Sequence, residues 1–76
     1  MAERYAVATF ASTFDALEAE RCCREAGVPG RIIPLPTHLS AECGLAWRMP
    51  AEPSARASFE HACAGRVRVA AWFELA

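Results

Sequence analysis

The chain of 76 residues is long enough for a single domain spanning residues 1–76, with a modest core that is also compatible with a homodimer. Its composition, 54% hydrophobic and 22% charged, is typical of a globular protein and excludes a disordered chain. The formal net charge is −1, which gives no electrostatic basis for nucleic-acid binding. All eight cationic residues are arginine, and we interpret this as a compositional habit rather than as a phosphate site.

The cellular location follows from what the sequence lacks. No apolar run approaches the roughly 20 residues that a membrane helix needs, so we expect no membrane association. Residues 1–4 lead directly into a predicted strand without the layout of a signal peptide, which favours the cytoplasm. Thiols stay reduced there, and the cysteines at 22, 23, 43 and 63 contain no C-x-x-C spacing. We therefore expect no disulfide framework, metal or cofactor.

The first half of the chain begins with a strand and a helix. Residues 5–10 are apolar on both faces, which predicts a central strand. Ser12 followed by Asp15 resembles a capping box, so we expect a helix over 13–26 that ends at Gly27. The predicted inner stripe of this helix is Ala16, Ala19, Cys23 and Ala26, with Leu17 beside it.

Two further strands are predicted on either side of a loop. Residues 31–36 form the second strand, and Pro34 assigns it to a sheet edge because proline cannot donate a ladder hydrogen bond. Ser40 is placed to cap a single helical turn over 41–43. The third strand is predicted over 44–49.

The last two elements are a helix and a strand. The helix should open at Pro53 or Ser54 and end near Cys63, before Gly65. Its predicted inner stripe is Ala55, Phe59, Ala62 and Cys63. Residues 66–75 alternate clearly, and we expect the face turned away from the helices to carry Arg68 and Trp72. An exposed tryptophan there would mark a partner or dimer surface, or equally a lone surface aromatic.

The order of elements is βαββαβ. It predicts an α+β, ferredoxin-like split βαβ fold, a four-stranded antiparallel sheet with two helices on one face. In this topology the first and third strands are central and the other two are edges.

The candidate functional residue is Cys43. It directly precedes Gly44, whose lack of a Cβ lets solvent and other backbone approach the sulfur, and it lies where a loop meets a strand. A nucleophilic or sulfur-carrying role needs a thiolate. His38 could accept the thiol proton if the loop folds back, whereas the neighbouring Glu42 opposes ionisation. The alternative is a small buried hydrophobic residue at the start of a strand.

The other cysteines are more simply explained by packing. Cys22 and Cys23 point about 100° apart on a helix and cannot converge on one metal. We expect Cys23 and Cys63 in the core and Cys22 partly exposed. His61, beside Glu60, should lie on a solvated face.

Two blocks of the sequence resemble the family of small selenium/sulfur carrier-like domains. The first is F-A-S-T-F-D-A-L-E-A-E-R at 10–21 with E-A-G-V at 25–28, and the second is I-P-L-P at 33–36 with L-S-A-E-C-G-L-A at 39–46. The matching residues are Ser12, Thr13, Ala16, Leu17 and Glu20, then Pro36, Ser40, Cys43, Gly44 and Leu45. The resemblance implies that Cys43 carries sulfur or selenium, received from a donor protein, as a persulfide or selenopersulfide.

The chain departs from this family at two places. Thr37 and His38 stand where an arginine and an acid are common, which removes one stabiliser of a thiolate for which His38 could substitute. Cys22 and Cys23 stand where the family commonly has leucines, which agrees with a packing role.

Three functions therefore stay open. The first is a non-enzymatic carrier based on Cys43, supported by Ser40, Gly44 and His38. The second is a small dimeric binding or regulatory module without thiol chemistry. The third is an enzyme with a Cys43–His38 pair, which ranks last because no third orienting residue is evident.

Overall fold

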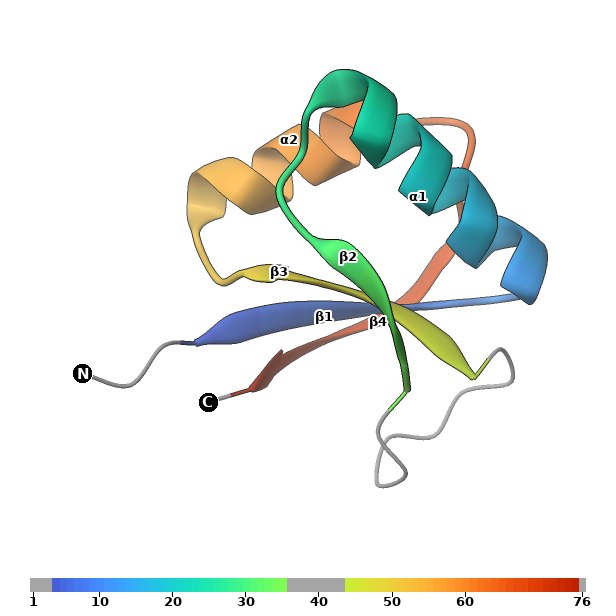
Figure 1. The fold of residues 1–76 in the computed structure, drawn as a ribbon, viewed down its shortest axis with the longest axis horizontal. Helices are drawn as coiled ribbons and strands as arrows, with labels where there is room; N and C mark the ends of the chain where they lie inside the picture. Colours follow the sequence, from blue (N-terminus) through green and yellow to red (C-terminus); the bar gives the residue numbers. More distant parts are fainter. Residues whose placement is uncertain (1–3, 36–43, 76) are drawn as a thin grey trace.

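The computed structural model describes residues 4–35 and 44–75 (Figure 1). Four strands form one antiparallel sheet in the order β2-β3-β1-β4, and two helices lie on one side of it (Figure 1). The elements in chain order are β1 (Tyr5–Phe10), α1 (Thr13–Ala26), β2 (Arg31–Pro34), β3 (Leu45–Pro50), α2 (Pro53–Cys63) and β4 (Val69–Leu75). This arrangement confirms the predicted α+β, ferredoxin-like class, with β1 and β3 central and β2 and β4 at the edges.

The predicted bounds agree best for β1 and the two helices. Those of β1 and α1 are the predicted ones. β2 ends at Pro34, and β3 runs one residue later than expected. β4 begins at Val69 rather than at residue 66, because the residues before it form the turn and connection that follow α2. In the described parts of the chain, neither helix is long and apolar enough to cross a membrane.

Both ends of α1 carry the predicted caps. The Asp15 backbone N–H donates to Ser12 Oγ at 3.2 Å, and the Ser12 hydroxyl donates to Asp15 Oδ2 at 2.8 Å. This satisfies a backbone donor that the first turn of a helix leaves without a partner. At the other end Gly27 adopts a left-handed φ of +73°, and the Val28 N–H donates to the Cys23 carbonyl at 2.9 Å. The paired caps explain why the helix has sharp bounds.

Asp15 also joins α1 to the residue before β4, and this contact predicts that stability depends on pH. The Ser12 hydroxyl, the Arg68 backbone N–H at 3.2 Å and the Arg68 charge lower the pKa of Asp15 below its usual 3.8, although burial opposes the shift. A carboxyl group whose pKa is lower in the folded protein than in the unfolded chain stabilises the fold at pH values above its unfolded-state pKa. This stabilisation is lost as the pH falls through the folded-state pKa. We expect urea unfolding to show a smaller loss of stability between pH 5 and pH 2.5 in Asp15→Asn than in wild type.

The control for this experiment is Glu52→Gln. Glu52 is the N-cap residue of α2, and its side chain makes no capping hydrogen bond. This variant should therefore keep the wild-type pH dependence. If Asp15→Asn and Glu52→Gln have the same profile, Asp15 does not contribute to the acid sensitivity of the fold.

The core lies between the sheet and the two helices. Phe59 of α2 is 1% exposed, and its ring lies 6.3 Å from Trp47 of β3 and 5.2 Å from Trp72 of β4, measured between centroids. The other buried members of this cluster are Ala8, Phe10, Ala16, Ala19, Cys22, Cys23, Val28, Met49, Ala55 and Cys63. The aromatic rings therefore connect α2 to strands on both sides of β1.

The predicted orientation of β4 is wrong. Trp72 pairs with Ala8 and lies on the helix side of the sheet, where it meets Phe59 edge to face. A register shift between Thr9 and Phe10 inserts one extra residue, so that Val69 and Trp72 both pack against the core. Simple alternation across 66–75 cannot produce this arrangement.

The predicted positions of Arg68 and of the buried face of α1 also differ from those in the structure. Arg68 precedes β4, and its guanidinium lies 3.8 Å from the Asp15 carboxylate rather than on the open face of the sheet. Cys22 is 4% exposed rather than partly exposed, while Ala26 and Leu17 are exposed. The buried stripe of α1 is displaced because α1 packs against α2 as well as against the sheet.

Candidate functional site

The hairpin of β2 and β3 holds together the two ends of the predicted functional segment. Pro34 pairs with Leu45 across the hairpin, and the Leu35 N–H donates to the Gly44 carbonyl at 3.0 Å. Antiparallel pairing of β2 with β3 (Figure 1) therefore ends with residues 35 and 44 side by side. The chain leaves the described structure at Leu35 and re-enters it at Gly44.

Gly44 has a backbone conformation that suits glycine. Its φ is +73°, in the left-handed region that residues with a Cβ rarely adopt. It is exposed, and within residues 4–35 and 44–75 no atom other than those of its chain neighbours lies within 4 Å of the position that a Cβ would take. Cys43, Ser40, His38 and the helical turn predicted over 41–43 lie outside the described residues, so their roles stay predictions.

Cys23 and Cys63 lie in the core, as predicted. Cys23 is fully buried and Cys63 is 4% exposed. Burial raises the pKa of Cys23 to about 12, and the Cys63 thiol beside it contributes to the increase. Burial also raises the pKa of Cys63. Because the thiolate is the nucleophile, neither sulfur is suited to covalent chemistry near neutral pH.

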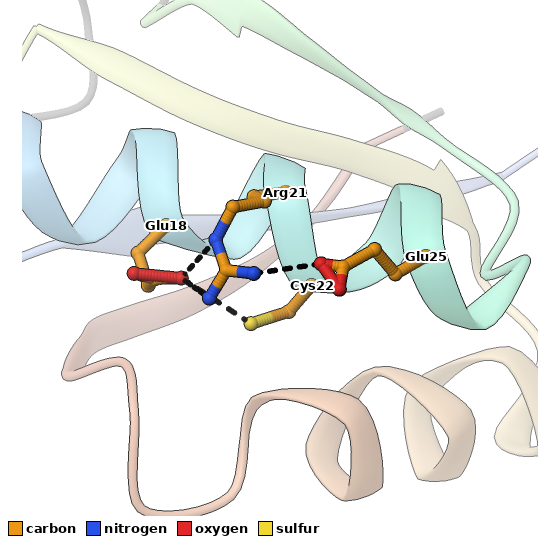
Figure 2. Close-up of polar contacts among 4 residues, drawn as sticks. All are labelled: Glu18, Arg21, Cys22 and Glu25. Atoms are coloured by element: carbon orange, nitrogen blue, oxygen red, sulfur yellow. Dashed lines mark hydrogen bonds and ion pairs between the residues drawn. The ribbon is translucent and has the colours of Figure 1, made fainter.

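Cys22 belongs to a polar network along α1 (Figure 2). Its thiol donates to Glu18 Oε1 at 3.7 Å. Arg21 joins the same Glu18 carboxylate to Glu25, with Nη1 of Arg21 2.6 Å from Glu25 Oε2, and these partners raise the pKa of Arg21 (Figure 2). The spacing of three and four residues is the sequence signal for this network. It supports the helix and places the sulfur as a buried hydrogen-bond donor.

His61 lies on the surface of α2. His61 is exposed in the last turn of α2, in agreement with the predicted solvated face. Within residues 4–35 and 44–75, no group of three or more His, Cys, Asp or Glu side chains could hold a metal ion.

A surface pocket of about 430 Å³ lies between the start of α2 and β4. The Arg56 guanidinium lies 4.3 Å from the Trp72 ring centre and pairs with Glu60 at 2.9 Å. Glu52 and Glu74 also line this pocket, which is therefore of mixed charge. Among the described residues that line this pocket there is no thiol, and none of them matches the chemistry predicted for Cys43.

Comparison with known proteins gives one family. The family model described as "Putative Se/S carrier protein-like" matches residues 5–62, from the first residue of β1 almost to the end of α2. The matched range extends beyond the two sequence blocks that suggested the family and includes Cys43. No curated protein and no solved structure matches the chain. The match covers well over half of the chain, and the protein therefore belongs to the Se/S carrier protein-like family.

Proposed function

We propose that the protein is a non-enzymatic carrier in which Cys43 accepts a sulfur or selenium atom and passes it on. The Cys43 thiolate attacks the outer sulfur of a persulfide on a donor protein. A sulfur–sulfur bond forms on Cys43 while the bond within the donor's persulfide breaks, and the donor leaves as a thiolate. The exchange requires no net oxidant. Attack by an acceptor thiolate on the outer sulfur then restores Cys43, and a selenopersulfide would carry selenium in the same way.

The burial of the other three cysteines carries this proposal. Cys22, Cys23 and Cys63 are each less than 5% exposed, and the last two have raised pKa values. The family match includes Cys43, and its chain neighbour Gly44 is exposed. These observations favour Cys43 over the other thiols as the carrier. Reduced core thiols also fit the cytoplasm, where we place the protein.

The alternative is a binding or regulatory module, which was suggested by the predicted position of Trp72. The sequence predicts Trp72 on the open face of the sheet, but Trp72 is partly buried on the helix side, where it packs against Phe59. A variant at Trp72 would therefore change its packing against Phe59 and could not test partner binding by itself. We favour the carrier for this reason.

Tryptic mass spectrometry can test the proposal because the arginines separate the cysteines. Cleavage after Arg31 and Arg48 leaves Cys43 as the one cysteine in peptide 32–48, apart from Cys22 and Cys23 in peptide 22–24 and Cys63 in peptide 57–66. After incubation of the protein with a low-molecular-weight persulfide, we expect an added sulfur atom on peptide 32–48. Reductant should remove it.

Two controls decide the outcome. Cys43→Ser should carry no added sulfur, whereas Cys22→Ser should load to the same extent as wild type because Cys22 is buried. Loading mainly on peptides 22–24 or 57–66, or no loading on any peptide, would contradict the carrier proposal.

A further inference from the structure

Two arginines face each other across the edge hairpin, at the end away from Pro34 and Leu45. Arg31 of β2 pairs directly with Arg48 of β3 in the antiparallel register. Like charges at directly opposed positions of a sheet destabilise it unless something neutralises them. Over residues 4–35 and 44–75, neither guanidinium lies within 4 Å of a carboxylate. The arginines that do have an acidic partner are Arg4, Arg21, Arg24, Arg56 and Arg68.

Arg48 is held in place by an aromatic ring. Its guanidinium carbon lies 3.8 Å from the centre of the Tyr5 ring, and the side chain is partly buried. A guanidinium that stacks through its flat face keeps its N–H donors in the plane, directed away from the ring. The contact with Tyr5 therefore fixes the Arg48 guanidinium and leaves its N–H groups available to donate hydrogen bonds to a ligand.

A surface pocket of about 250 Å³ lies at this pair of arginines. It is lined by Tyr5, Gly30, Arg31, Arg48, Met49 and Pro50, none of which is acidic. Pockets for drug-sized ligands are usually larger, at about 300–1,000 Å³, so this one suits a small ligand. Its charged lining residues are Arg31 and Arg48.

We propose that this pocket binds a small oxyanion of the phosphate or sulfate class between Arg31 and Arg48. Planar guanidinium groups bind such oxygens through paired, charge-assisted hydrogen bonds, and two of them can bind opposite edges of one anion. The bound anion would also remove the repulsion between the two arginines. The net charge of −1 favours a small anion at a local pair over a long polyanion such as nucleic acid.

The oxyanion pocket is separate from the proposed carrier function. The Arg31–Arg48 pair lies three residue pairs along the hairpin from Pro34–Leu45, or about 10 Å at 3.4 Å per residue. A negative result for sulfur loading on Cys43 would therefore not contradict the oxyanion site. A negative result for phosphate binding would likewise not contradict the carrier proposal.

Calorimetric titration with inorganic phosphate tests the site, with sodium chloride adjusted to keep ionic strength constant. We expect saturable binding by wild type and at least a tenfold weaker affinity in both Arg31→Gln and Arg48→Gln. Arg66→Gln removes the same charge from an exposed position outside the pocket and should bind like wild type. Arg48→Lys keeps the charge but loses the planar fork, so its affinity should fall between those of wild type and Arg48→Gln.

Thermal unfolding provides a second readout. Phosphate at ten times its dissociation constant should raise the Tm of wild type by roughly 5–10 °C, and the Tm of Arg31→Gln by far less. Without phosphate at low ionic strength, Arg31→Gln should melt at or above wild type because the opposed charges are gone. Equal responses in all variants would mean a general salt effect and would overturn the proposal. Tighter, Arg31-dependent binding of a glutamate-rich peptide that phosphate does not displace would also overturn it, in favour of a protein partner.

Discussion

Replacing Gly30 by alanine should destabilise the protein by about 4 kcal/mol, among the largest effects expected of any single substitution. Gly30 has a φ of +136°, which residues with a Cβ rarely adopt. A Cβ there would lie 2.6 Å from the Arg48 carbonyl oxygen and 2.7 Å from the Trp47 indole. Both neighbours are held by β3, one as backbone and the other as a ring in the core. Neither neighbour can therefore move away from the added Cβ without disturbing β3 or the core.

The expected loss is large beside the total stability. A chain of 76 residues should have roughly 4–11 kcal/mol of unfolding free energy. Thermal unfolding followed by circular dichroism should thus show Gly30→Ala melting about 15–30 °C below wild type, or unfolded at room temperature.

Gly65→Ala is the matched control. Gly65 also has a positive φ, of +72°, but among the described residues no atom outside its chain neighbours lies within 4 Å of the Cβ position. Only the backbone strain applies, and the cost should be about 1 kcal/mol. If the two variants have similar Tm values, steric contact with Trp47 and Arg48 is not what requires glycine at position 30.

Local signals predicted most of the fold. Ser12, Asp15 and Gly27 specify the ends of α1 through contacts within a few residues, so its bounds are those expected from the sequence. Pro34 indicated an edge strand for a reason that depends only on its missing N–H, and β2 does lie at the edge. These features depend on neighbouring residues and can be read without the tertiary structure.

Features that depend on register could not be predicted. The extra residue in β4 opposite Thr9 and Phe10 determines which face Trp72 occupies, and alternation alone indicated the wrong one. The juxtaposition of Arg31 with Arg48 likewise needs the alignment of β2 against β3. The burial of Cys22 requires the position of α2 beside α1.

The same distinction between local signals and tertiary packing applies to the candidate site. The motif around Cys43 is local, so sequence could suggest both the residue and the family, and the family match extends over it. The buried state of the competing thiols is a tertiary property, and it came only from the packing of α1, α2 and the sheet. The preference for Cys43 therefore combines a local sequence motif with the exclusion of the other three cysteines, which are buried by tertiary packing.

Replacing Phe59 by alanine should cost about 3–5 kcal/mol of unfolding free energy. Phe59 is 1% exposed and is the ring through which α2 meets both Trp47 and Trp72. α2 has 11 residues and no side-chain cap at Glu52, so its own helical propensity is weak support and packing must hold it in place. Urea unfolding followed by tryptophan fluorescence measures the loss, because both tryptophans contact the deleted ring.

The same substitution at Phe14 separates packing from residue type. Phe14 also lies in a helix, but its side chain is 74% exposed, so Phe14→Ala should change the unfolding free energy by less than about 0.5 kcal/mol. A difference of several kcal/mol between the two variants would show that α2 is attached through the Phe59 contacts. Comparable losses would instead mean that Phe14 packs against something in solution, and that the attachment of α2 depends on smaller side chains such as Ala55 and Cys63.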